Sequence, residues 1–205
     1  MRGPHSTSPH PILTAIISPA RDIFHMSSYY LQRALTSEIP KLFADLRASG
    51  LSISLDTNDD PAQAWHRDVL NALCYVDVLL PNEREACLLA LETDMGKAIK
   101  ILRSLVPLLI IKRGSLGATA YTPTGCCSAA ARQVKVIDAV GAGDSFNAGF
   151  LHGWVRGWPI EDSLAFGNLS GAWSTTESGG TTAFHGKERL AAFHKAWADS
   201  LPGQS

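Results

Sequence analysis

The sequence predicts an α/β protein with a mostly parallel central sheet and helices on both faces. Strand-like and helix-like segments alternate from Asp22 onward, and the connections between them are short. One strand-like segment, "PLLIIKRG" (107–114), is a continuous apolar run of the kind that parallel sheets bury on both faces. Such alternation is typical of a sheet covered by helices above and below.

The first half of the chain contributes most of the expected parallel strands. We expect strands at 22–28, 51–58 and 76–82, and helices at 36–50, 61–73, 83–92 and 94–105. The helix at 36–50 has its apolar residues on one face and ends at Gly50, a residue that commonly terminates helices. The helix at 61–73 begins with Pro61, whose fixed φ suits a helix start.

The second half completes the sheet and adds a helical end. After the strand at 107–114 we expect a β-hairpin over 117–137, and then helices at about 142–156, 159–177 and 186–199. Residues 1–11 are polar and proline-rich without periodicity, so they are expected to be a disordered lead-in to a single domain over 12–200.

Charge and composition exclude several classes of partner. The chain has 18 basic and 19 acidic residues, which leaves no basic surface for nucleic acid. Its densest apolar run, at 105–111, is far shorter than the roughly 18 residues of a membrane span. The 4 cysteines form no C-x-x-C pair and fit free thiols in a reducing compartment, so we expect a soluble, cytoplasmic protein.

Ligands of parallel α/β sheets bind at the carboxyl ends of the strands, so the residues there are the candidates for chemistry. In "DAVGAGD" (138–144), Gly141 and Gly143 allow a tight turn whose N–H groups, with the start of the next helix, suit a phosphate. Asp144 beside this turn could accept a proton from an attacking hydroxyl. The alternative is that Asp144 only caps the helix and offsets its dipole.

The other strand ends each have two interpretations. Asn82 and Glu85 could hold Mg²⁺ through its waters, or could form a capping box. The turn from Gly114 to Gly117 could lie along phosphates, or could be a plain hairpin turn. Asn168 could face an adenine or pack a helix, and Asp56 could order Mg²⁺-bound waters or form an Asx turn.

Taken together and in this order, the motifs resemble those of the PfkB/ribokinase family of carbohydrate kinases. "DAVGAGD" resembles the family signature D-T-x-G-A-G-D, "NERE" (82–85) its N-x-x-E motif, and "KRGSLGA" (112–118) its K-x-G-x-x-G nucleotide loop. The resemblance extends over about 22–198 and implies a ribokinase-like three-layer α/β/α fold. It also implies an ATP-dependent phosphotransferase that acts on the hydroxyl of a sugar or a sugar-like substrate.

The resemblance assigns a role to each candidate. It implies that Asp144 is the catalytic base and that Gly141, Ala142 and Gly143 form the anion hole for the transferring phosphoryl group. It also implies that Lys112, Gly114 and Gly117 line the phosphates of ATP and that Asn168 lies near the adenine. Asn82 and Glu85 would serve the Mg²⁺ site. Asp138 and the segment 174–181 would match a site for a monovalent cation such as K⁺. Ala139 departs from the usual threonine of the signature, which removes a hydroxyl contact.

The sequence also departs from the family at its N-terminal end. Nothing here resembles the first strands, the β lid or the Gly-Gly-x-x-x-Asn-type sugar motif of the family, so we expect an exposed strand edge that a second copy or another partner covers. The alternative function is therefore a catalytically silent nucleotide-binding fragment. A Rossmann-type dinucleotide enzyme is disfavoured, because "GAGD" does not open the first βαβ unit and lacks the G-x-G-x-x-G spacing.

Overall fold

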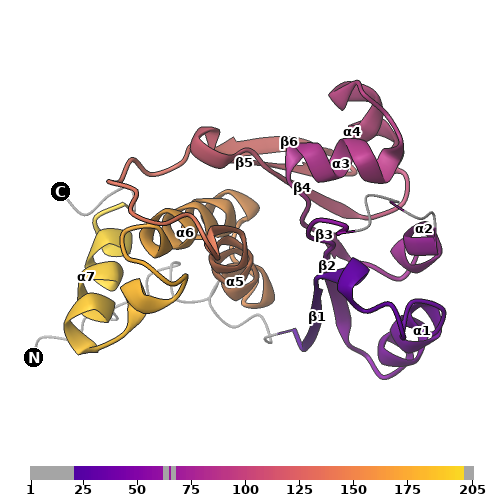
Figure 1. The fold of residues 1–205 in the computed structure, drawn as a ribbon, viewed down its shortest axis with the longest axis horizontal. Helices are drawn as coiled ribbons and strands as arrows, with labels where there is room; N and C mark the ends of the chain where they lie inside the picture. The colour runs from indigo at the N-terminus through magenta and orange to yellow at the C-terminus, as the bar shows by residue number, and fades with distance from the viewer. Residues whose placement is uncertain (1–20, 62–64, 66–67, 201–205) are drawn as a thin grey trace, which may run out of the picture.

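The computed structural model describes residues 21–61, 65 and 68–200, and within them six strands form one sheet. The strands lie side by side in the order in which they occur in the chain. The first four pair in parallel, and the last two are antiparallel to their neighbours (Figure 1). They are β1 (Ile23–Ser27), β2 (Ser52–Asp56), β3 (Val78–Leu79), β4 (Leu108–Lys112), β5 (Ala118–Thr122) and β6 (Gly125–Ala129). The predicted mostly parallel sheet is confirmed.

Seven α-helices are described around this sheet. They are α1 (Ile39–Ala48), α2 (Asp68–Leu73), α3 (Glu83–Ala90), α4 (Met95–Arg103), α5 (Ala142–Val155), α6 (Ile160–Ser174) and α7 (Lys187–Ala198). Short 3₁₀ turns, which the sequence did not indicate, occur at Tyr29–Leu31, Gly114–Leu116 and Thr182–Phe184.

The helices form two layers, one on each face of the sheet. Helices α1–α4 pack on one face and α5 with α6 on the other, while α7 packs on the outer side of α6 (Figure 1). Strand β4 shows why, because Leu109 and Ile111 belong to the α1–α4 core whereas Leu108 and Ile110 belong to the α5–α6 core. A strand that is apolar on both sides requires cover on both sides, and the predicted three-layer α/β/α architecture is confirmed.

Small residues bring α5 and α6 close together. A Cβ atom on Gly149 of α5 would lie 2.8 Å from Cβ of Ser170 and 2.9 Å from the carbonyl oxygen of Phe166, both on α6. Real side chains do not approach so closely, so glycine is required at this contact. The two helices therefore form a tightly packed pair, and the N-terminal end of α5 carries Asp144.

Three expectations about the elements need correction or cannot be compared. The hairpin ends at Ala129, not at 137, because the side chain of Asn168 binds the carbonyl oxygens of Ala129 and Ala130 and takes the chain away from strand pairing. Pro61 lies in a turn, and the helix after it begins at Asp68. The predicted lead-in at 1–11 lies outside the described residues.

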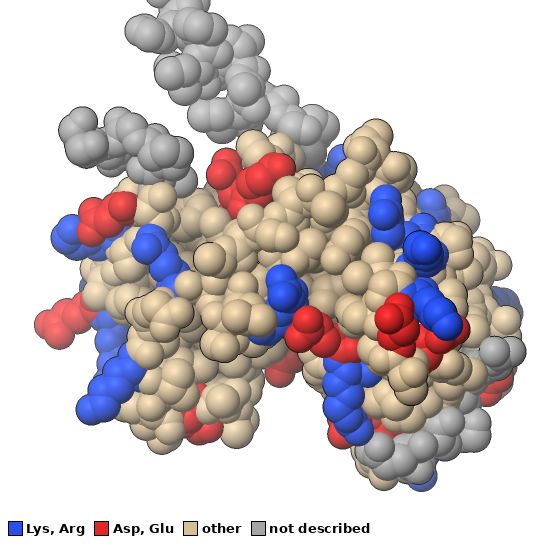
Figure 2. Space-filling model, turned by 90° about the horizontal axis from the view of Figure 1, so that it is seen from above, with Lys and Arg blue, Asp and Glu red and all other residues tan. Residues whose placement is uncertain are grey.

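The edge of the sheet at β1 is unpaired in the described part of the chain, as the sequence led us to expect. Strand β1 pairs with β2 only, and His25 and Ser27 on it are exposed. None of the helices in residues 21–61 and 68–200 combines the length and apolar character that a bilayer crossing requires. Acidic and basic side chains are interspersed over the face drawn in Figure 2.

Candidate active site

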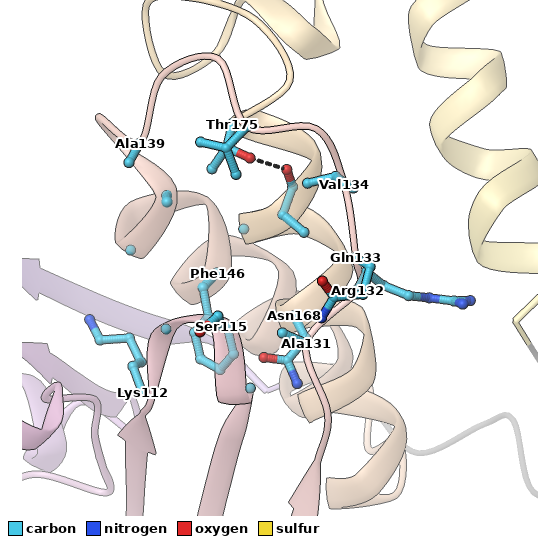
Figure 3. Close-up of a pocket in the computed structure, with 17 residues that line it drawn as sticks. Lys112, Ser115, Ala131, Arg132, Gln133, Val134, Ala139, Phe146, Asn168 and Thr175 are labelled. Atoms are coloured by element: carbon cyan, nitrogen blue, oxygen red, sulfur yellow. Dashed lines mark hydrogen bonds between the residues drawn. The ribbon is translucent and has the colours of Figure 1, made fainter.

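A cavity of about 320 Å³ lies between the carboxyl end of β4, the N-terminal half of α5 and the C-terminal half of α6. Its walls are the loop that follows β4, the segment 131–136 that leaves the hairpin, and residues of α5 and α6 (Figure 3). Lys112 lies at one end of this cavity, and Gln133 and Val134 lie at the other. Six of the predicted site residues line it: Lys112, Gly114, Gly117, Ala142, Gly143 and Asn168.

The turn before α5 is a tight glycine turn at a helix N-terminus, as the sequence predicted. Gly141 is the N-terminal cap of α5 with φ 75°, a left-handed conformation that favours glycine. A Cβ atom there would also lie 3.0 Å from Cα of Gly180, so the turn is packed against the 174–181 segment. The first N–H groups of a helix have no partners within it, and they carry the positive end of its dipole.

Asp144 stands in the first turn of α5 with an exposed side chain. Within the described residues its carboxylate accepts no hydrogen bond and forms no ion pair. The helix is capped by Gly141 without a side-chain hydrogen bond, so Asp144 is not the capping residue, whereas its place in the first turn fits the other half of that alternative, an offset of the helix dipole. A carboxylate without a hydrogen-bonding partner is free to accept a proton from a substrate.

Lys112 brings a positive charge to the same turn. Its Nζ lies 3.7 Å from the position that a Cβ atom would occupy on Gly143. The ammonium forms a 2.6 Å ion pair with Oδ2 of Asp56, whose side chain is completely buried at the end of β2. Asn147 of α5 accepts a 3.4 Å hydrogen bond from Lys112 and donates a short one to Asp56.

The loop from Gly114 to Gly117 depends on both glycines for different reasons. Gly117 has φ 92° and ψ −137°, and a Cβ atom on it would overlap the carbonyl oxygen of Ala129. Gly114 has φ 55°, and no atom lies within 4 Å of the place where its Cβ would be. Gly117 is therefore held by contact with β6, whereas Gly114 faces open space beside the cavity.

Asn168 is a buried residue of α6 that holds the segment 131–136, one wall of the cavity, in place. Its Nδ2 donates hydrogen bonds of 2.8 Å to the carbonyl oxygen of Ala129 and 3.3 Å to that of Ala130. These bonds direct the segment 131–136 along the cavity (Figure 3). The amide nitrogen of Asn168 thus shapes the wall.

Asn82 and Glu85 form the capping box that the sequence left open as an alternative. Oδ1 of Asn82 accepts a 2.8 Å hydrogen bond from the N–H of Glu85, and Oε2 of Glu85 accepts one of 2.8 Å from the N–H of Asn82. Burial raises the pKa of Glu85, and the nearby charge of Asp56 raises it further. Within the described residues Oε1 of Glu85 has no hydrogen-bond partner, so capping and metal binding are compatible.

Asp138 lies outside the cavity and ties two loops together. Its carboxylate accepts hydrogen bonds of 3.0 Å from the N–H of Val140 and 3.0 Å from the N–H of Gly179. These two backbone donors lower the pKa of Asp138. The structure thus brings Asp138 to the 174–181 segment with which the sequence associated it.

The sequence interpretation did not identify Asn147 or the cavity-lining segment 131–136. Asn147 lies three residues after Asp144 on the same helix face, a spacing that could have indicated it. The segment 131–136 has neither helix nor strand structure and no motif, so nothing in its sequence marks it as a wall.

Residues 12–185 match the family model described as pfkB family carbohydrate kinase. The chain belongs to this family. Among PfkB relatives, the ATP-dependent ribose-1-phosphate kinase of Halopiger xanaduensis is 31% identical over 150 residues, which are 73% of this chain and 50% of that protein. The 2-dehydro-3-deoxygluconokinase of Bacillus subtilis is 33% identical over 74% of this chain and 49% of its own. This PfkB chain spans about half the length of the curated relatives it matches.

Solved structures of sugar kinases share the fold. The fructokinase of Vibrio cholerae O395 superposes with a TM-score of 0.72 at 27% identity, over 88% of this chain and 63% of the fructokinase. It was crystallised with fructose, ADP and a calcium ion, and in a double-mutant form with fructose, ADP and a potassium ion.

Proposed function

We propose that this chain carries the nucleotide site and the phosphoryl-transfer machinery of an ATP-dependent kinase for the hydroxyl group of a sugar or sugar-like molecule. One arrangement carries the proposal: Lys112 and the glycine turn at the N-terminus of α5 line one end of the cavity, and Asp144 follows this turn directly in the chain, although its side chain is not among the lining residues. Family membership and the kinases named among its relatives support it.

The chain's own residues suggest how transfer would proceed. Asp144 accepts the proton of the attacking hydroxyl, since its carboxylate has no other partner among the described residues. The N–H groups of Gly141 and Gly143, that of Ala142 once it leaves its 3.3 Å hydrogen bond to the carbonyl oxygen of Ala139, and the ammonium of Lys112 would stabilise the charge on the phosphoryl group in flight. The cavity wall is mainly apolar and suits a flat purine ring; its apolar side chains include Val134, Val136, Ala139, Phe146 and Ala172.

The residues present also fit the metal ions that the family implies. Asn82 and Glu85 would hold Mg²⁺ through waters, because Oε1 of Glu85 is not used by the capping box. Bound Mg²⁺ would neutralise charge on the nucleotide phosphates. Asp138 and the 174–181 segment would hold a monovalent cation such as K⁺, with Asp138 keeping the two loops together.

The first test is the thermal midpoint of the chain with and without Mg²⁺ and ADP. A ligand that binds only the folded state stabilises it by about 2.7 kcal/mol at a hundred times its Kd, so we expect a rise that requires both components. A cooperative melt that Mg²⁺–ADP leaves unchanged would contradict the nucleotide site. A nucleotide-dependent rise with no phosphorylation over a broad sugar panel would favour a silent nucleotide-binding protein.

The second test is Asp144→Asn. We expect turnover to fall by about 10²- to 10⁴-fold while the Mg²⁺–ADP shift stays the same, because the base is lost and the anion site remains. Asp162→Asn is the matched control, since Asp162 occupies the equivalent first-turn position of α6, away from the cavity. Retained turnover in Asp144→Asn would remove Asp144 as the base.

We also propose that a second copy of the chain covers the edge of β1. An unpaired edge strand without charged residues offers a template for pairing, and Ile23–Ser27 carries none. Light scattering across a concentration series should therefore show a dimer. A monomeric mass at all concentrations would contradict this.

A further inference from the structure

We infer that Asp56 and Asn147 are positioning residues that hold the ammonium of Lys112 at the terminal phosphoryl group of the nucleotide. This inference rests on the proposed function and adds to it a source of selectivity for the nucleoside triphosphate over the diphosphate. It concerns residues outside the signature turn: Asp56 at the end of β2 and Asn147 in the second turn of α5.

The three side chains form a closed network. Oδ2 of Asp56 accepts from Nζ of Lys112 at 2.6 Å and also from Nδ2 of Asn147, while Oδ1 of Asn147 accepts from Lys112 at 3.4 Å. Asp56 and Asn147 are 0% and 1% exposed, so neither can adjust by moving into water. The backbone N–H of Asn58 binds the other oxygen of Asp56 at 3.2 Å and fixes that carboxylate in turn.

This network leaves one donor of Lys112 for a ligand. An ammonium group has three N–H donors, and Asp56 and Asn147 occupy two of them. The nitrogen lies 3.7 Å from where a Cβ atom would stand on Gly143, and Lys112 lines the cavity. The remaining donor is therefore at the phosphate end of the cavity, beside the turn that starts α5.

Stability alone does not account for a lysine at this place. The N-terminus of a helix is the positive end of its dipole, so a nearby cation is unfavourable there. The 14-residue helix α5 presents this end to Lys112, and the buried carboxylate of Asp56, at 2.6 Å from the ammonium, offsets the repulsion. The N-terminus of α5 and the ammonium of Lys112 together suit a dianionic ligand such as a terminal phosphoryl group.

Asn147 also links this ammonium to the base. Residues three apart lie on the same face of a helix, so Asp144 and Asn147 are set by the same stretch of α5. Any shift of α5 along its axis would move the base and the hydrogen-bond partner of Lys112 together. The network thus keeps the ammonium of Lys112 at a constant position relative to the carboxylate of Asp144.

The test compares the affinities of Mg²⁺–ADP and of the magnesium complex of the non-hydrolysable ATP analogue AMP-PNP, measured by titration calorimetry. Asn147→Leu keeps the approximate volume of the side chain and removes both of its hydrogen bonds. Asn168→Leu is the matched control, because it makes the same change at a buried asparagine in the far wall of the cavity. The ratio of the two affinities does not depend on how much of a variant is folded.

The wild-type chain should bind the analogue more tightly than ADP, and Asn147→Leu should lower this preference by about tenfold. Asn168→Leu should weaken both ligands and leave the ratio as in wild type. An unchanged ratio in Asn147→Leu, or equal wild-type affinities for the two ligands, would overturn the inference and leave the proposed function standing. A wild-type chain that binds neither ligand would overturn the proposed function itself.

If Asn147→Leu does not melt cooperatively, Asn147→Ala gives the same comparison, because it leaves the Asp56–Lys112 ion pair in place without adding bulk. A loss of preference in Asn147→Ala supports the inference. An unchanged preference there overturns it.

Discussion

Two glycines of one loop, Gly114 and Gly117, provide a test that separates folding from binding. Gly114→Ala adds a methyl group in open space at φ 55°, whereas Gly117→Ala adds one that overlaps the carbonyl oxygen of Ala129. The same substitution three residues apart should therefore have opposite consequences. Gly117→Ala should damage the fold, and Gly114→Ala should damage the ligand site.

The magnitudes follow from backbone conformation and contact. A residue with a Cβ in the left-handed region costs about 1–2 kcal/mol, which is the only penalty for Gly114→Ala. Gly117→Ala carries a backbone penalty of similar size, since φ 92° with ψ −137° is a region used almost only by glycine. Its Cβ would also lie 2.7 Å from the nitrogen of Ala131, and such overpacking adds about 1–3 kcal/mol.

Thermal melts with and without Mg²⁺–ADP measure both effects. At about 2–4 °C per kcal/mol for a chain of this size, Gly117→Ala should melt about 2–12 °C below Gly114→Ala. Gly114→Ala should lose most of the nucleotide-dependent rise, because Gly114 lines the cavity beside Lys112 and the added methyl group would take up space there. Equal melting temperatures of the two variants, or a full nucleotide response in Gly114→Ala, would refute the reasoning.

Two further predictions concern carboxylates whose pKa values are shifted. Because burial raises the pKa of Glu85 above its ordinary 4.5, its contribution to stability is present below that pH and is lost as the pH rises through the raised value. The urea midpoint of Glu85→Gln should therefore rise relative to that of wild type as the pH is raised from acid to neutral. A difference between the two midpoints that does not vary with pH would contradict this. Asp138 has a pKa below its ordinary value of 3.8. The stability that its carboxylate gains from the hydrogen bond with the N–H of Gly179 is therefore present above pH 3.8 and is lost as the pH falls through the lowered pKa. Asp138→Asn should remove the extra Mg²⁺–ADP shift that K⁺ gives over Li⁺ at neutral pH, and an unchanged K⁺ effect would count against a cation site there.

Much of the fold could be predicted because its information is local. The apolar run that became β4 needed cover on both faces, and the alternation of segments placed helices there. The turn at Gly141 was also predictable, since glycine, a helix start and an acidic residue occur within one heptapeptide.

What could not be predicted depends on contacts between distant residues. Asn147 acts through Asp56, which lies 91 positions earlier in the chain, and no local pattern records that pairing. The hairpin ends at Ala129 because of Asn168, 39 positions later. The motif between Asn82 and Glu85 was ambiguous for another reason: one pair of side chains can cap a helix and still present an oxygen to a metal ion.

The close contact of α5 with α6 affects how tolerant the chain is of mutation. Gly149 touches no part of the cavity, yet any side chain there would push the two helices apart at Ser170 and so displace the end of α5 that carries Asp144. A saturation mutagenesis screen scored by growth or catalysis would therefore mark Gly149 as intolerant, alongside the residues that perform the chemistry. Intolerance at Gly149 reflects the short distance between two helices and not a role in the chemistry. Protein abundance measured in parallel with activity would distinguish variants that fail to pack from variants that fold but do not react.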